Sequence, residues 1–117
     1  MKVLFYKKTR NPVHDFIHAI NKNDRTKVLS CLKNIEELGF DSPMVQFRHI
    51  RGKLWEIKIQ ASNGYRFFYV GLHSDILVLL HAYKKQSQKA PIKEITIAEK
   101  RLSEVLKDES HYISSIG

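Results

Sequence analysis

The hydrophobic pattern of the chain changes its period at Met44, and this change limits the folds that the chain can adopt. Beyond Met44, apolar residues recur at every second position in four segments, at residues 45–50, 54–59, 65–70 and 76–83. A period of two is typical of β-strands. Turn signals such as Ser62-Asn63-Gly64 separate the segments, so we predict four consecutive antiparallel strands.

The first half of the chain carries helical patterns after one short β-prone run at residues 3–6. Pro12 is well placed as the first residue of a helix. Two apolar stripes with helical spacing follow, at Val13, Phe16, Ile17 and Ile20 and at Val28, Leu32, Ile35 and Leu38. Gly39 ends the second stripe, so we expect a helical hairpin.

A last helix is predicted from Pro91, with Glu94 in its first turn and apolar residues spaced along one face. The predicted order is therefore β-α-α-β-β-β-β-α. It indicates an α+β fold in which a helical hairpin and a C-terminal helix pack on a twisted, mostly antiparallel five-stranded sheet. With 117 residues and 43% hydrophobic content, we expect a single domain over residues 1–117.

The basic residues are concentrated in the strand-like segments. The chain has 20 Lys and Arg against 12 Asp and Glu, a net charge of +8. Residues 1–10 hold four bases and no acid, and residues 44–93 hold nine bases and two acids. Such a distribution indicates a sheet face that binds phosphate groups.

Alternation assigns side chains to the two faces of this sheet. Trp55 and Phe67 share the face that we expect the helices to cover, which leaves Glu56 and Arg66 together on the other face. The continuous apolar run at residues 76–80 indicates a strand buried on both faces. A basic stretch follows this strand and contains Lys84, Lys85 and Lys89.

Three blocks of sequence resemble a known family. They are Leu54-Trp55-Glu56-Ile57, then Gly64-Tyr65-Arg66-Phe67-Phe68-Tyr69, then Leu79-Leu80-His81-Ala82-Tyr83-Lys84-Lys85 with Gln88-Lys89-Ala90-Pro91 and Glu94-Ile95. In this order they resemble the RelE/ParE superfamily of toxins from type II toxin-antitoxin systems, and within it the HigB-like, phage-derived branch.

The resemblance implies a RelE-like fold and a cytoplasmic toxin that inhibits translation by cleaving mRNA in the ribosomal A site, without a cofactor. It also implies a cognate antitoxin, expected to be a helix-turn-helix DNA-binding protein, and contact with operator DNA only through that antitoxin. Arg66 corresponds by resemblance to the arginine that meets the scissile phosphate. Lys84 and Lys85 correspond to the basic residues after the last strand.

Metal-independent cleavage by attack of the 2′-hydroxyl needs a proton acceptor, a proton donor and cations for the phosphorane. The planar guanidinium of Arg66 suits the last role, although Arg66 could instead pair with Glu56. Glu56 could accept a proton or only orient Arg66. Alternation points only one of Lys84 and Lys85 inward, for phosphate contact or proton transfer.

Other side chains near this face are candidate site residues, and each has two possible roles. His81 could transfer protons or be structural, and Tyr83 could stack on a base or close the core. We expect four cations to contact RNA: Arg48, Arg51, Lys53 and Lys89. The first three lie around the turn between the first two strands of the meander, and they could instead belong to a solvated turn.

Two alternative functions remain at this point: a non-cleaving toxin of the ParE type that binds DNA gyrase, or a plain RNA-binding module. The basic strand residues favour RNA over gyrase, and the chain has no RNP-type or GXXG signature. His14 and His18 lack a third metal ligand with suitable spacing, so we expect no metal site. The single Cys31 and the absence of a long apolar stretch favour a reducing cytosol over a membrane.

Overall fold

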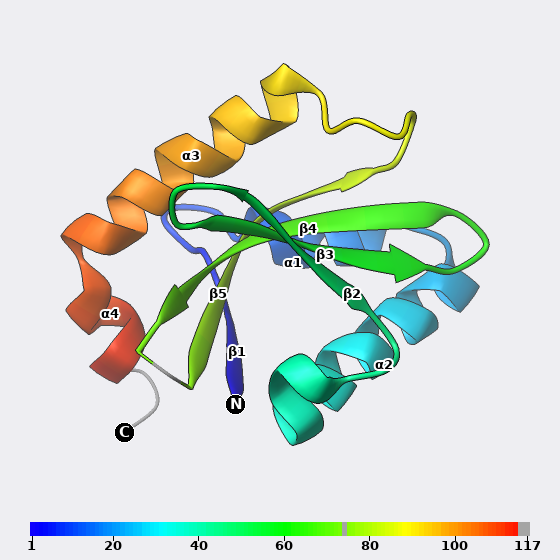
Figure 1. The fold of residues 1–117 in the computed structure, drawn as a ribbon, viewed down its shortest axis with the longest axis horizontal. Helices are drawn as coiled ribbons and strands as arrows, with labels where there is room; N and C mark the ends of the chain where they lie inside the picture. Colours follow the sequence, from blue (N-terminus) through cyan, green and yellow to red (C-terminus); the bar gives the residue numbers. More distant parts are fainter. Residues whose placement is uncertain (74, 115–117) are drawn as a thin grey trace.

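The computed structural model of the protein describes residues 1–73 and 75–114. Its elements follow the predicted order, with a short 3-10 helix (η1) and a short terminal helix (α4) added (Figure 1). In chain order they are β1 (Lys2–Phe5), α1 (Pro12–Ala19), α2 (Lys22–Leu38), η1 (Gly39–Asp41), β2 (Gln46–Arg51), β3 (Leu54–Gln60), β4 (Gly64–Leu72), β5 (Ile76–Lys84), α3 (Ile92–Lys107) and α4 (Glu109–Ile113).

The five strands form one sheet in the order β1-β5-β4-β3-β2. Strands β2 to β5 are an antiparallel meander, as the turn signals predict. Strand β1 pairs with β5 in parallel, so that Lys2 lies opposite Ile76 and Phe5 lies opposite Leu79. The predicted α+β class with a mostly antiparallel sheet is confirmed, and it is the architecture expected of a RelE-like fold.

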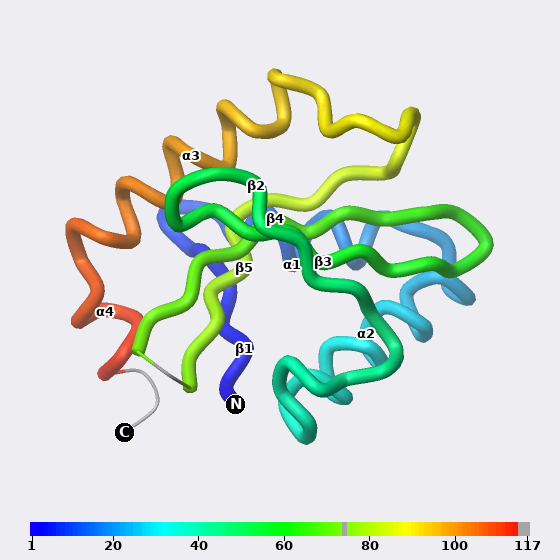
Figure 2. The backbone as a smooth tube through the Cα atoms, in the orientation of Figure 1, coloured from blue at the N-terminus to red at the C-terminus, as the bar shows by residue number. Residues whose placement is uncertain are grey.

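Helices cover both faces of the sheet, and the ribbon in Figure 1 and the backbone tube in Figure 2 show how they are arranged around it. Val13, Ile17 and Ile35 of α1 and α2 pack in one cluster with Ile57 and Phe67 of the sheet. A second cluster on the opposite face joins strands β3 to β5 to α3 and α4, through residues that include Leu54, Val70, Leu80, Ala98, Val105 and Tyr112. The run Leu77 to Leu80 is completely buried between these clusters, which confirms the predicted two-sided strand.

Two predicted core residues lie at the surface instead. Leu38 is exposed because α2 ends there, at Gly39, whose positive φ of 62° turns the chain away from the helix axis. Trp55 faces the side of α2 as predicted but is 38% exposed. Its ring packs on His49 of β2, with ring centroids 4.9 Å apart.

No helix within residues 1–73 and 75–114 is long and apolar enough to cross a lipid bilayer.

Candidate active site

A basic pocket lies on the α3 side of the sheet, beside the end of β3 and the start of β4. Its volume is about 370 Å³. Three cations, Lys58, Arg66 and Lys85, line it, and none of the described residues that line it is acidic. The remaining lining residues are uncharged: Pro43, Met44, Val45, Gln46, Ile59, Gln60 and Gln88. Such a lining is suited to an anion and offers amide groups for hydrogen bonds.

Arg66 occupies this pocket from a nearly buried position, with 7% of its surface exposed. Its Nε lies 3.8 Å from Oε1 of the completely buried Glu56, and Nη2 of Arg48 lies 2.9 Å from the same oxygen. Neither carboxylate oxygen of Glu56 accepts a well-aligned hydrogen bond from the described part of the chain. The carboxylate therefore acts as a counter-charge between two guanidinium groups and is not itself open to a ligand.

Lys58 is a pocket residue that the sequence reasoning did not select. It lies opposite Arg66 in the β3–β4 ladder and opposite Gln46 in the β2–β3 ladder. Partial burial lowers the pKa of the Lys58 amine, and the nearby charges of Arg48 and Arg66 lower it further. Lys58 lies two residues after Glu56, so strand alternation puts both on the same face, and that signal could have identified it.

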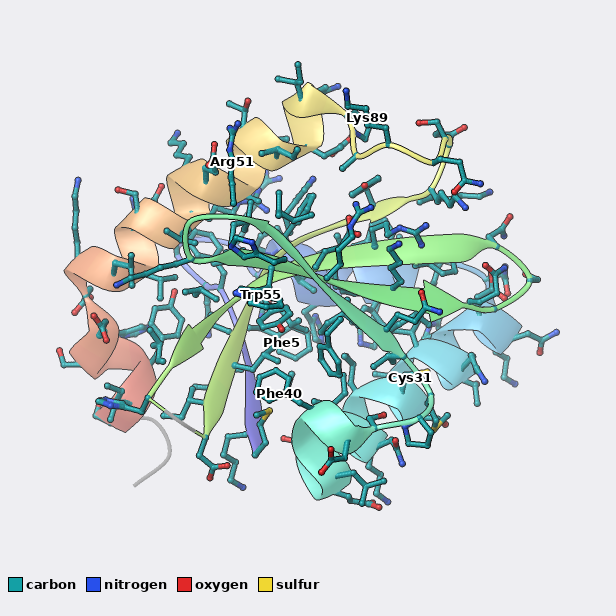
Figure 3. All side chains as sticks on the ribbon, viewed as in Figure 1. Phe5, Cys31, Phe40, Arg51, Trp55 and Lys89 are labelled. Atoms are coloured by element: carbon teal, nitrogen blue, oxygen red, sulfur yellow. The ribbon has the colours of Figure 1, made fainter. Side chains whose placement is uncertain are left out.

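The structure separates the two lysines at the end of β5. Lys85 lines the basic pocket, whereas Lys84 is exposed and lies opposite Tyr65. The backbone N–H of Lys85 donates to the carbonyl of Gly64 at 2.8 Å. A Cβ at Gly64 would lie 3.3 Å from Oε1 of Gln60 and 3.4 Å from both Cβ and Cδ of Lys85, so Gly64 packs closely against both side chains. Lys89 is exposed on the loop before α3 (Figure 3).

His81 and Tyr83 lie in the packed layer between β5 and α3, outside the pocket lining. Nε2 of His81 is 2.6 Å from Oε1 of Glu94, and Nη1 of Arg101 is 3.3 Å from Nδ1. Because the guanidinium can only donate, Nδ1 accepts and Nε2–H donates, which is the neutral tautomer. Burial lowers the pKa of His81, in agreement with that form.

Tyr83 belongs to the core on the α3 side, where its ring stacks on Phe68 with centroids 5.7 Å apart. Burial raises the pKa of the Tyr83 hydroxyl to about 12, and the nearby Glu56 contributes to this rise. The ring closes the core under Arg66, its partner in the β4–β5 ladder.

The candidate RNA-binding residues of the β2–β3 hairpin have different surroundings. Arg48 is half-buried against Glu56, as described above, and Lys53 is exposed at the turn. Arg51 makes two hydrogen bonds to Glu99 of α3, from Nε at 2.8 Å and from Nη2 at 2.5 Å. Figure 3 shows Arg51 beside α3, so its guanidinium ties the hairpin to that helix.

A buried carboxylate on the other side of the sheet fixes the turn that precedes Arg66. Asp24 of α2 accepts hydrogen bonds from Ser62 Oγ at 2.6 Å, Tyr65 Oη at 2.6 Å and Asn63 Nδ2 at 3.2 Å. The hydroxyls of Ser62 and Tyr65 hold the pKa of Asp24 well below its ordinary value. Sequence reasoning missed this network, because Asp24 is about forty residues away from the turn and reads only as part of a helix start.

The remaining polar candidates do not form a cluster. The rings of His14 and His18 lie 4.3 Å apart, but no group of three or more His, Cys, Asp or Glu side chains suited to a metal ion occurs within residues 1–73 and 75–114. Cys31 is completely buried in the helical-hairpin core, as expected. Burial raises the pKa of its thiol.

Comparison with known proteins identifies one family. The family model described as "Phage derived protein Gp49-like (DUF891)" matches residues 15–103, which is more than half of the chain and includes β2 to β5. No curated protein matches the chain significantly.

Proposed function

We propose a function on the premise that this chain belongs to the Gp49-like family of phage-derived proteins, a RelE/ParE-like family of toxins from toxin-antitoxin systems. The proposed function is that of an endoribonuclease which cleaves mRNA on the ribosome. We place it in the HigB-like branch and treat residues 1–117 as one toxin domain. The family implies an antitoxin partner. The cleavage activity, the mRNA substrate and the ribosomal A site are our inference.

The basic pocket is the observation that carries this proposal. Its three cations come from neighbouring strands and from the end of β5, and no acid interrupts them. A phosphate placed there meets the guanidinium of Arg66 and the ammonium of Lys85. A fixed cation at the position where charge develops can lower the barrier by about 3 kcal/mol, as a single oxyanion donor does.

Lys58 is our candidate for the group that accepts the proton of the 2′-hydroxyl. The amine lines the same pocket as Arg66, and its lowered pKa makes the unprotonated form more accessible at neutral pH. In the proposed step, this proton moves to Lys58 while the 2′-oxygen bonds to phosphorus. The bond from phosphorus to the 5′-oxygen then breaks, the 5′-oxygen takes up a proton from water, and a 2′,3′-cyclic phosphate is left.

Glu56 is in our proposal a positioning residue and not the proton acceptor. Its carboxylate is completely buried and is placed between Arg48 and Arg66, so a substrate hydroxyl cannot reach it without displacing them. Its negative charge reduces the repulsion among the cations and keeps the guanidinium of Arg66 at the pocket wall.

The proposal is tested by inducing the protein alone in bacteria and mapping new mRNA 5′ ends across the transcriptome. We expect cuts inside translated codons, in a fixed position relative to the reading frame. Arg66→Ala should abolish them, and Arg10→Ala is the matched control because Arg10 is an exposed arginine outside the pocket. Growth arrest with intact mRNA would contradict cleavage and favour a non-cleaving toxin of the ParE type.

A further inference from the structure

We propose that the antitoxin places an apolar side chain in a hollow on the α2 side of the sheet and reaches across the edge strand β2 to the basic pocket. The aromatic hollow has a volume of about 830 Å³. It is lined by Phe40, Ser42, Val45, Gln46, Phe47, Trp55, Tyr69 and Gly71. The inference rests on the toxin role of the chain and does not depend on RNA cleavage.

Large aromatic side chains are exposed at this hollow. Phe40 is 57% exposed and Trp55 is 38% exposed. The ring centroid of Phe40 lies 5.1 Å from that of Phe47, which in turn lies 6.1 Å from that of Tyr69. Figure 3 shows Phe40 beside the end of α2 and Trp55 on the sheet. Rigid rings around an open apolar hollow are typical of the central anchor of a protein interface.

Strand β2 separates this hollow from the basic pocket. It is the outermost strand of the sheet, so one of its edges has no partner strand within residues 1–73 and 75–114. Phe47 points to the hollow, and its neighbour Arg48 points to the other face, where it meets Glu56. Val45 and Gln46, just before and at the start of β2, line both cavities. A segment that lies along the free edge of β2 can therefore contact both cavities.

The charges identify the occupant. None of the side chains that line the hollow is charged, so nothing there recognises a phosphate and the lining suits apolar side chains of a protein. The adjacent basic pocket requires negative charge. A second copy of this chain, with a net charge of +8, would bring like charges together at that place. An antitoxin segment with an apolar anchor followed by acidic residues satisfies both cavities.

The test compares two exposed apolar residues by isothermal titration calorimetry. The variants are Phe40→Ser, in the hollow, and Ile92→Ser, the matched control at the start of α3, where Ile92 is 78% exposed. The probe is the purified protein encoded by the gene adjacent to this one. We expect Phe40→Ser to weaken binding by about tenfold or more, and Ile92→Ser to leave the affinity unchanged. Circular dichroism verifies that both variants are folded.

Salt dependence tests the second half of the proposal. Lys85→Gln should reduce the slope of affinity against salt concentration, because it removes one of the charges that the acidic residues contact. An unchanged affinity of Phe40→Ser, or an unchanged slope for Lys85→Gln, would overturn the proposal. The proposal would also be overturned if sedimentation showed that the free chain is a dimer and that Phe40→Ser dissociates this dimer. All three readouts measure association, so a failure of the nuclease proposal would not affect them.

Discussion

Lys58 and Arg66 face each other across the β3–β4 ladder, two basic side chains as direct cross-strand partners. Like charges in this arrangement destabilise a sheet. The buried carboxylate of Glu56 lies two residues before Lys58 and 3.8 Å from Nε of Arg66, so it offsets part of this repulsion. The pair gives the pocket one cation that stays charged and one amine whose pKa is lowered.

Lys58→Arg separates the charge of this residue from its ability to accept a proton. Arginine keeps the positive charge but does not lose its proton, so we expect cleavage to fall by about 10²-fold or more. The measurement is single-turnover cleavage on programmed ribosomes from about pH 6 to pH 9, where the wild-type rate should rise as the Lys58 amine deprotonates.

The same pH series should be flat for Lys58→Arg. Lys85→Arg is the matched control, because we propose only phosphate contact for Lys85 and expect most of the activity to remain. A Lys58→Arg variant that is as active as the wild type would exclude Lys58 as the proton acceptor.

Glu56→Gln should destabilise the fold, because it removes the counter-charge of two arginines, one of them nearly buried. We expect a loss of about 2 to 3 kcal/mol in the free energy of unfolding, below the full cost of a broken buried pair because Arg48 is partly exposed. Urea unfolding measures this loss.

Cleavage by the folded Glu56→Gln protein distinguishes the two roles of this residue. If Glu56 only positions Arg66, Glu56→Gln should weaken substrate binding but keep the rise of the cleavage rate with pH. If that rise is lost in Glu56→Gln and kept in Lys58→Arg, Glu56 would instead be the proton acceptor.

The hydrogen-bonded carboxylate of Asp24 should make the stability of the protein decrease at low pH. Its hydrogen bonds lower the pKa of Asp24 below the ordinary 3.8. As the pH falls through this range, the unfolded chain therefore binds more protons than the folded protein does. The stabilisation is complete above about pH 5 and is lost progressively at lower pH. We expect the Tm of the wild type to decrease below about pH 4, and Asp24→Asn to have a lower Tm at pH 6 with a shallower dependence.

Thermal unfolding followed by circular dichroism at several pH values tests this prediction. Asp15→Asn is the control, because Asp15 is exposed on α1 and accepts no hydrogen bond from the β3–β4 turn. Parallel pH curves for the wild type and Asp24→Asn would contradict the assignment.

Arg51→Ala should leave mRNA cleavage unchanged, because the Arg51 guanidinium is bound by Glu99 and lies outside the pocket lining. Both side chains are exposed, so we expect only a weak coupling between them in a double-mutant cycle with Glu99→Ala. Arg48→Ala is the comparison, and it should reduce cleavage by disturbing Glu56 and Arg66. If Arg51→Ala is as stable as the wild type but loses cleavage, the result would support the RNA-binding role of Arg51 that the sequence predicts.

Local patterns in the sequence predicted most of the fold. Alternation gave the four strands of the meander and placed Glu56 and Arg66 on one face, where their side chains meet. Alternation also predicted that only one of the two lysines at the end of β5, Lys84 and Lys85, points inward, but it could not say which. Lys85 is the inward residue because its backbone is bonded to Gly64 at the start of β4.

Contacts between distant segments could not be predicted in this way. The bonds of Asp24 to the β3–β4 turn and of Arg51 to Glu99 join residues about forty to fifty positions apart, and each partner looks ordinary in its own segment. The exposure of Trp55 also depends on which part of the sheet the helices cover, which no single segment specifies.

The parallel pairing of β1 with β5 limits how early in synthesis the sheet can be completed. Strand β1 pairs with residues 76–79, so this pairing cannot form until β5 has been synthesised. Pairings of such wide sequence separation form slowly, because a long loop must close before they contribute. The pocket itself needs Lys85, which follows β5. A chain that has been synthesised only as far as β5 therefore lacks Lys85 and cannot form the complete basic pocket.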